Sequence, residues 1–184
     1  MPNVLVVYAS THGHTGRIAE RICEVLRTAG LGAEARRLTG AGAAADLDGV
    51  DAVVVGASVH AGHHQTEVVD WVRAHEAALG GMPTALFSVS LTAADPEPGG
   101  QDVARGYADE LLDDTGWDPQ EVRCFAGALQ YLEYGFMTRL LVRLIASQKD
   151  LPTDVHHDVD LTDWDAVEAF AREVAALVTP AVAR

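Results

Sequence analysis

Short apolar runs alternate with amphipathic segments along the whole sequence, and this alternation restricts the fold more than any other feature. The first run, Val4-Leu5-Val6-Val7-Tyr8, is short and rich in β-branched residues, which is typical of a strand buried on both faces. The next segment, 15–29, places Ile18 and Ile22 on one face of a helix and stops at Gly30. A strand followed by an amphipathic helix and a further strand is the βαβ unit of a parallel sheet.

The same pattern repeats to the end of the chain. Strands are predicted at 4–8, 33–38, 51–56, 83–89 and 121–129, and helices at 15–29, 65–79, 101–114 and 162–178. We therefore expect an α/β fold, a doubly wound five-stranded parallel sheet with helices on both faces. The length of 184 residues fits one domain, 1–184. An extra segment after the fifth strand, about 130–161, is too long for an ordinary connection, and such excursions are often functional.

Charge and cysteine content narrow the class of protein. The chain has 13 basic and 27 acidic residues, a net charge of -14 at pH 7, so it repels a phosphate backbone and we expect no nucleic-acid partner. The two cysteines, Cys23 and Cys124, lie far apart without metal-ligand spacing, which fits a reducing compartment. No run reaches the ~20 apolar residues of a membrane span, and Met1-Pro2-Asn3 leads directly into a strand. These features predict a cytoplasmic protein.

The loop after the first strand has the composition of a phosphate site. Ser10-Thr11-His12-Gly13-His14-Thr15 offers three hydroxyls and a glycine directly before a helix N-terminus. Backbone N–H groups and the helix dipole attract an anion there, beyond the carboxyl end of a strand, where open α/β sheets bind ligands. A P-loop is excluded because Arg17 and Ile18 follow Gly16, where Lys and Ser or Thr are required. The simpler alternative, a turn with a helix cap, needs only one hydroxyl.

Five segments in order resemble one known family. The loop at 10–15 resembles the flavodoxin phosphate loop, whose usual form is Ser/Thr-x-Thr-Gly-x-Thr. Residues 51–64 (DAVVVGASVHAGHH) and 82–91 (MPTALFSVSL), with 126–131 (AGALQY) and 162–164 (TDW), are similar to the menaquinone-dependent protoporphyrinogen dehydrogenases, a flavodoxin-like branch. The resemblance covers nearly the whole chain. It implies a flavodoxin-like fold, FMN as cofactor, and an oxidoreductase that passes electrons from a porphyrinogen to a quinone.

The resemblance also implies which residues would hold FMN. The phosphate would lie on Ser10, Thr11, His12, Gly13, His14 and Thr15. The ring would lie between two further loops, one formed by Ala57, Ser58, Val59, His60, Ala61 and Gly62, the other by Ser88, Val89, Ser90, Leu91 and Thr92. His60 is the candidate catalytic residue, because a histidine titrates near neutrality and is long enough to reach the ring edge or a substrate.

The ring loops also have simpler interpretations. His60, His63 and His64 fall within five positions, but metal ligands usually come from more than one element, so no metal is expected. His64 is expected on the solvated start of the following helix, whereas the roles of His60 and His63 stay open. Ser88 and Ser90 would equally suit the polar end of a strand.

Two classes of function remain after this comparison. Neither ring loop contains Trp or Tyr, whereas electron-carrier flavodoxins commonly cover the ring with aromatic side chains. An open ring face favours an enzyme with a small-molecule redox substrate or a quinone. The alternatives are an electron carrier that docks on a redox partner protein through its acidic surface, and a flavin-free scaffold.

The segment 136–149 contains Arg139, Arg143 and Lys149. It is predicted either to make peripheral membrane contact or, more simply, to form a core-packed helix whose arginines reach solvent. The sequence leaves the oligomeric state open.

Overall fold

The computed structural model describes residues 1–10, 12–39, 47–96, 99–129 and 159–179. Its strands are β1 (Asn3–Tyr8), β2 (Gly32–Arg37), β3 (Ala52–His60), β4 (His63–His64), β5 (Thr84–Ser90), β6 (Glu121–Ala126), β7 (Ala128–Leu129) and β8 (Val159–Asp160). Its helices are α1 (His14–Thr28), α2 (Thr66–Leu79), the short η1 (Thr92–Ala94), α3 (Gly100–Thr115) and α5 (Trp164–Val178). These bounds agree with the predicted elements to within a few residues, except after β3 and β6.

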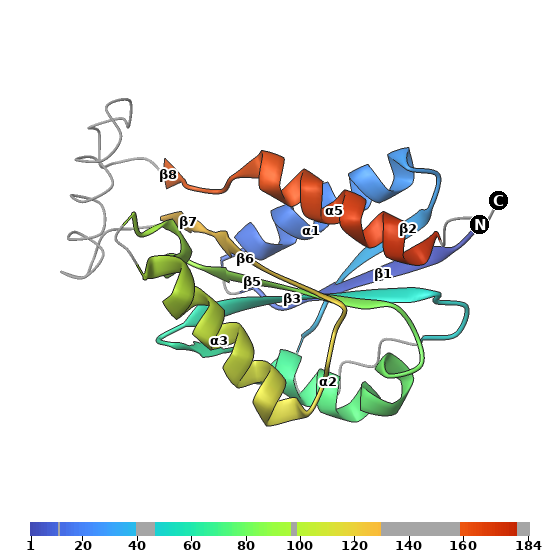
Figure 1. Ribbon diagram of the computed structural model, residues 1–184, viewed down its shortest axis with the longest axis horizontal. Coiled ribbons are helices and arrows are strands. Elements are labelled where there is room, and N and C mark those ends of the chain that lie inside the picture. Colours follow the sequence, from blue (N-terminus) through green and yellow to red (C-terminus); the bar gives the residue numbers. More distant parts are fainter. Residues whose placement is uncertain (11, 40–46, 97–98, 130–158, 180–184) are drawn as a thin grey trace.

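In the described part of the chain, five parallel strands form a sheet in the order β2-β1-β3-β5-β6 (Figure 1). β1 lies inside the sheet, where Val6 pairs with Ala35 of β2 and with Val54 of β3. The order reverses at β1, because the chain passes outward to β2 and then returns beyond β1 to β3. The predicted doubly wound parallel sheet is therefore confirmed, and the carboxyl ends of its strands share one edge.

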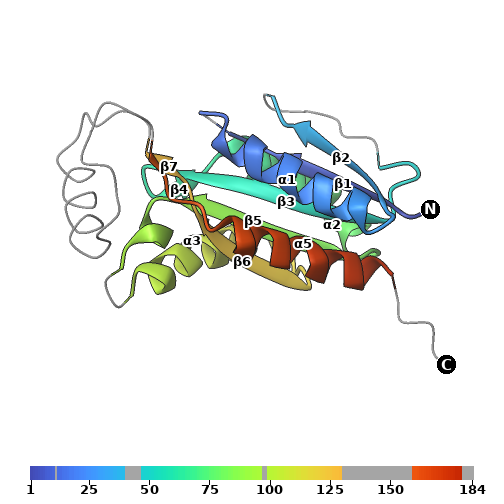
Figure 2. The ribbon, with the colours of Figure 1, turned by 90° about the horizontal axis from the view of Figure 1, so that it is seen from above.

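Helices cover both faces of the sheet. α1 and α5 lie side by side on one face, and α2 and α3 cover the other (Figures 1 and 2). Val4 and Val6 of β1 pack with α1 and α5, whereas Leu5 and Val7 pack with α2 and α3. Successive side chains of a strand point to opposite faces, so the uninterrupted apolar run of β1 contributes to both cores.

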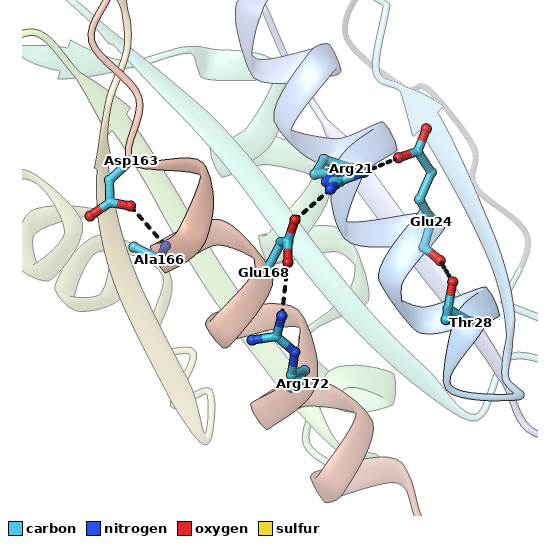
Figure 3. A network of polar contacts seen from close by, with 7 residues as sticks. All are labelled: Arg21, Glu24, Thr28, Asp163, Ala166, Glu168 and Arg172. Carbon is cyan, nitrogen blue, oxygen red and sulfur yellow. Dashed lines mark hydrogen bonds and ion pairs between the residues drawn. The ribbon is translucent and has the colours of Figure 1, made fainter.

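Ion pairs join α1 to α5 along their contact (Figure 3). Arg21 of α1 contacts Glu24 on its own helix, at 2.8 Å between Nη1 and Oε2, and also contacts Glu168 of α5. Asp163 begins α5 as its N-cap and accepts a hydrogen bond from the backbone N–H of Ala166 at 3.0 Å. α1 and α5 both begin at the carboxyl edge of the sheet, so the start of α5 lies close to the loop before α1.

Strand β3 is longer than predicted. The sequence predicted a strand at 51–56 and then a loop, but β3 continues to His60 and turns back into β4. Ala61 and Gly62 form the turn with φ angles of 51° and 87°, the left-handed pair that a two-residue hairpin requires. The turn residues are Ala61-Gly62 and not the Asn-Gly or Asp-Gly pair that is typical of such hairpins. The sequence therefore indicated a loop after 56.

The predicted strand at 121–129 is interrupted at Gly127. β6 ends at Ala126, and β7 turns away to pair antiparallel with β8, with Leu129 opposite Val159. This pairing joins positions far apart in the sequence, so no local pattern could indicate it. The excursion at 130–158, including 136–149, lies outside the described residues.

Candidate functional site

The three predicted loops meet at the carboxyl edge of the sheet. The end of β1 lies against β3, where the backbone N–H of Ala9 donates to the carbonyl of Gly56 at 3.1 Å. β3 in turn lies against β5, where Ser58 pairs with Val89. The loops after β1, β3 and β5 therefore surround the point where the strand order reverses, which is the usual ligand site of a doubly wound sheet.

The loop before α1 presents a helix N-terminus to this edge. Gly13 has a φ of 84°, and its N–H donates to the Ser10 hydroxyl oxygen at 2.8 Å. Arg37, at the end of β2, donates to the Ser10 carbonyl at 2.8 Å and holds the loop from one side. Within the described residues no side chain caps α1, so the N–H groups of its first turn remain donors for an anion.

The other predicted members of this loop differ in exposure. His12 is exposed, Thr15 is 1% exposed, and Thr11 lies outside the described residues. An added Cβ on Gly13 would meet no atom within 4 Å, so the glycine is required by its backbone conformation and not by space.

His14, the first residue of α1, turns away from the solvent and contacts the region before α5. Its Nε2 lies 2.6 Å from the Thr162 hydroxyl oxygen and 3.5 Å from a carboxylate oxygen of Asp160. The Thr162 hydroxyl donates to the carbonyl of Ala126, at the end of β6, at 2.8 Å. Burial lowers the pKa of His14 below its usual value, with an opposing effect from Asp160 and a further lowering from Arg17.

Sequence reasoning placed His14 in the phosphate loop but missed these contacts. The sequence 162–164 was expected to begin the last helix, and only the folded chain brings it against a residue 148 positions earlier. The one hint in the sequence that 162–164 lies near the phosphate loop was that both belong to the same set of family motifs.

A shallow groove of about 500 Å³ lies beside the loop, lined by Gly13, Gly16, Tyr8 and Trp164 among others. A Cβ added to Gly16 would lie 3.0 Å from the Tyr8 ring, so this position favours glycine. The Arg17 guanidinium carbon lies 5.5 Å from the centre of the Trp164 ring, a cation–π contact. One flank of the helix N-terminus therefore carries an aromatic ring and a guanidinium group, and Arg17 also lies 3.4 Å from the Asp160 carboxylate.

The second predicted loop is the end of the β3–β4 hairpin. Ser58 is its most informative residue, because its hydroxyl is buried and has no hydrogen-bond partner among the described residues. An unsatisfied buried hydroxyl at a ligand edge fits a group that a bound molecule would satisfy. His60 and Ala61 are exposed at the tip, where a ligand can reach them. Val59 is half-buried in the same strand.

The two histidines that follow take different directions. His63 Nδ1 lies 3.3 Å from a carboxylate oxygen of Glu110 on the exposed side of the hairpin. His64 is not solvated as expected: it is half-buried, with Nε2 2.9 Å from the Ser88 hydroxyl oxygen. Burial, with a smaller effect of His63, lowers the pKa of His64 to about 4. The prediction for His64 was wrong because this residue lies in strand β4 of the hairpin, where its side chain contacts Ser88 of β5, and not on the surface of the helix that follows.

The third predicted loop is mostly strand. Ser88, Val89 and Ser90 end β5 with buried side chains, and the Ser90 hydroxyl accepts from the backbone N–H of Ala93 at 3.2 Å. Leu91 and Thr92 are half-buried in the turn that follows. The Ser88 and Ser90 side chains are therefore engaged with the protein, which leaves the backbone of this turn as the part that can face a ligand.

The described residues do not favour thiol or metal chemistry. Burial raises the pKa of Cys23 to about 12 and also raises that of Cys124, so neither thiol forms a thiolate readily. Among the described residues, no group of three His, Cys, Asp or Glu side chains could hold a metal ion. Nor do these residues include a helix with the length and apolar character that crossing a bilayer requires.

A family model described as a flavodoxin domain matches residues 5–156. The chain belongs to the flavodoxin domain family. This confirms the resemblance on which the predicted site rests, and the solved structures agree with the fold. A flavodoxin variant from Pseudomonas aeruginosa superposes with a TM-score of 0.55 at 17% identity, over 96% of this chain and 98% of its own.

Curated members of the family are more similar in sequence. Protoporphyrinogen IX dehydrogenase [quinone] of Escherichia coli is 32% identical over 94% of each chain. The protein of the same name from Leishmania major is 34% identical over 96% of this chain and 76% of its own.

Proposed function

We propose that the chain is an FMN-dependent oxidoreductase that oxidises a porphyrinogen and passes the electrons to a quinone. The observation that carries the proposal is the 32% identity over 94% of both chains to a protoporphyrinogen IX dehydrogenase [quinone]. The similarity extends over almost the full length of both chains, so it is not confined to a single motif.

The geometry of the edge supports FMN as the cofactor. The phosphate is proposed to lie on residues 10–15, where the first-turn N–H groups of α1 are uncapped in the described structure. The ring is proposed to lie between 57–62 and 88–92, with the Ser58 hydroxyl, which has no hydrogen-bond partner among the described residues, donating to it. When bound, FMN supplies the two-electron redox chemistry, and the protein supplies binding, orientation and charge.

His60 is the proposed proton-transfer residue. It is exposed at the end of β3, within the hairpin proposed to cover the ring, and its imidazole can donate or accept a proton. Neither proposed ring loop contains Trp or Tyr. A substrate could therefore stack on the ring without displacing an aromatic side chain, which supports an enzyme over a pure carrier.

The proposal also concerns the cellular location and the reaction partners of the protein. We propose a cytoplasmic location, which the two cysteines, far apart in the sequence, support. Its partners would be a small-molecule donor and a quinone acceptor.

The test is an anaerobic assay of the FMN-loaded full chain with a porphyrinogen and a soluble quinone, followed by porphyrin fluorescence. We expect porphyrin formation that depends on both protein and quinone. A matched reaction without quinone should stop after the bound flavin is reduced. If the FMN-loaded chain shuttles electrons between redox proteins but leaves the porphyrinogen intact, it is an electron carrier and the enzyme proposal is overturned.

A further inference from the structure

The loop proposed to bind the phosphate is held from two sides by side chains. On one side Arg37 donates to the Ser10 carbonyl at 2.8 Å. On the other side His14 contacts Thr162 at 2.6 Å, and Thr162 is fixed to the end of β6 through Ala126. The second attachment joins the first residue of α1 to a segment that arrives 148 positions later in the chain.

The direction of these hydrogen bonds follows from the chemistry of the three groups. The Ala126 carbonyl can only accept, so the single hydroxyl proton of Thr162 is directed to it. The Thr162 oxygen must then accept from His14, which places the ring proton on Nε2. The Asp160 carboxylate, 3.5 Å from the same nitrogen, favours a proton at that position. The result is a relay from His14 to Thr162 to Ala126.

The other ring nitrogen opposes protonation of the ring. His14 Nδ1 is buried and has no hydrogen-bond partner among the described residues, so a proton there would be an unsatisfied buried donor. The charged groups that face the ring are Asp160 from β8, which attracts a proton, and Arg17 from α1, which repels one. Trp164 of α5 lies edge-on at 6.1 Å between ring centres and adds no charge.

The first turn of α1 depends on this relay more than an ordinary helix start would. Gly13 precedes it with a φ of 84°, and no described side chain caps the helix. With a glycine at the junction and no cap, no described side chain before the helix bonds to its first-turn N–H groups, so their direction depends on contacts made by the helix itself. Two side chains of that turn reach the segment before α5. Arg17 pairs with the Asp160 carboxylate at 3.4 Å on the exposed side, and His14 contacts Thr162 from a buried position.

We propose that His14 is a positioning residue for the phosphate site: through Thr162 it fixes the first turn of α1 so that its N–H groups converge on the phosphate of FMN. The inference rests on the proposed function, because it assumes that the ligand carries a phosphate at this loop. It predicts that the relay contributes to FMN affinity through the phosphate and contributes nothing to recognition of the ring.

The experiment compares FMN with riboflavin, which lacks the phosphate, by fluorescence titration of the full-length chain freed of flavin. His14→Leu and Thr162→Val each remove the relay with little change in side-chain volume. Each should weaken FMN binding about tenfold while riboflavin affinity stays within about twofold. The double variant should be no weaker than either single variant, because both changes remove one shared contact.

Two further variants separate positioning from a general effect on folding. His14→Gln retains an N–H donor near the position of Nε2 and should restore most of the FMN affinity. Thr28→Val is the matched control, because Thr28 also donates from a hydroxyl to a carbonyl, that of Glu24 at 2.9 Å, but near the far end of α1. Thr28→Val should leave the ratio of the two affinities unchanged.

The results distinguish this inference from the proposed function. If the unaltered chain does not prefer FMN to riboflavin, the phosphate site itself is absent and both proposals fail. If the unaltered chain prefers FMN but His14→Leu and Thr162→Val keep that preference, or lose both flavins equally, only the positioning role is overturned. Nitrogen NMR of the His14 ring gives an independent check: the relay requires a protonated Nε2 at neutral pH, and a protonated Nδ1 would refute it.

Discussion

The stability of the protein should fall in mild acid because of one buried histidine. His64 belongs to β4 of the β3–β4 hairpin and is half-buried, with Nε2 2.9 Å from the Ser88 hydroxyl oxygen, and burial lowers its pKa from 6.5 to about 4. In the unfolded chain the same side chain takes up a proton below pH 6.5. Between pH 6.5 and about pH 4 the unfolded state therefore binds more protons than the folded state, so the free energy of unfolding decreases as the pH falls.

The size of the effect follows from the two pKa values of His64. At pH 7.5 the ring is about 90% neutral in the unfolded state and fully neutral in the folded state, so its effect on stability is close to zero. At pH 5 the unfolded histidine is almost fully charged while the folded one is mostly neutral, which corresponds to a loss of about 2 kcal/mol relative to pH 7.5. Below pH 4 the loss levels off, because the folded histidine then takes up a proton as well.

The assay is urea denaturation of the unaltered chain and of His64→Gln at several pH values between 5.0 and 7.5. Glutamine can still contact Ser88 but does not titrate, so the stability difference between the two proteins should shift by about 2 kcal/mol across this range. Other titrating groups, including His14, are common to both proteins and cancel. His60→Gln, on the exposed tip of the same hairpin, is the control and should change the free energy of unfolding by less than about 0.5 kcal/mol at each pH.

Parallel stability curves for the unaltered chain and His64→Gln would refute this account. Such a result would mean that the His64 ring reaches solvent, and that the hairpin does not cover the end of β5 as described.

Three further substitutions test the edge of the sheet. Gly56→Ala should lower the free energy of unfolding in urea by about 1–3 kcal/mol, since its Cβ would lie 2.2 Å from Cζ of Phe87; an unchanged midpoint would contradict this packing. Gly13→Ala should weaken FMN binding about tenfold but not riboflavin binding in a fluorescence titration, because a φ of 84° is costly for alanine; equal losses would argue against a phosphate loop. Ala61→Gly should raise the free energy of unfolding by about 0.5–1 kcal/mol by relieving a φ of 51°, and a decrease would contradict the turn.

Local patterns predicted most of the fold because each strand and helix has its own signature in the sequence. The run from Val4 to Tyr8 is apolar on both sides, and it becomes an inner strand with a core on each face. The helix face containing Ile18 and Ile22 is fully buried, as its spacing predicted. The failures occurred where pairing depends on distant residues, as for Leu129 and Val159.

The candidate site was predicted less completely than the fold. The positions of the loops follow from the strand order, so placing 10–15, 57–62 and 88–92 at one edge required only the βαβ pattern. The directions of the side chains could not be predicted in the same way. His64 turns inward because of a hairpin, and His14 meets Thr162 because α1 and α5 begin at the same edge. Both contacts depend on the folded chain and leave no periodic signal.

The measurement that tests the central claim most directly is the rate of quinone-dependent porphyrinogen oxidation as FMN is added to the flavin-free full chain. We predict no activity without flavin, a rise that saturates near one FMN per chain, and little restoration by the same concentration of riboflavin. Activity that is independent of FMN, or that riboflavin restores equally well, would contradict the assignment of the edge around Ser10 and Gly13 as the phosphate end of an FMN site.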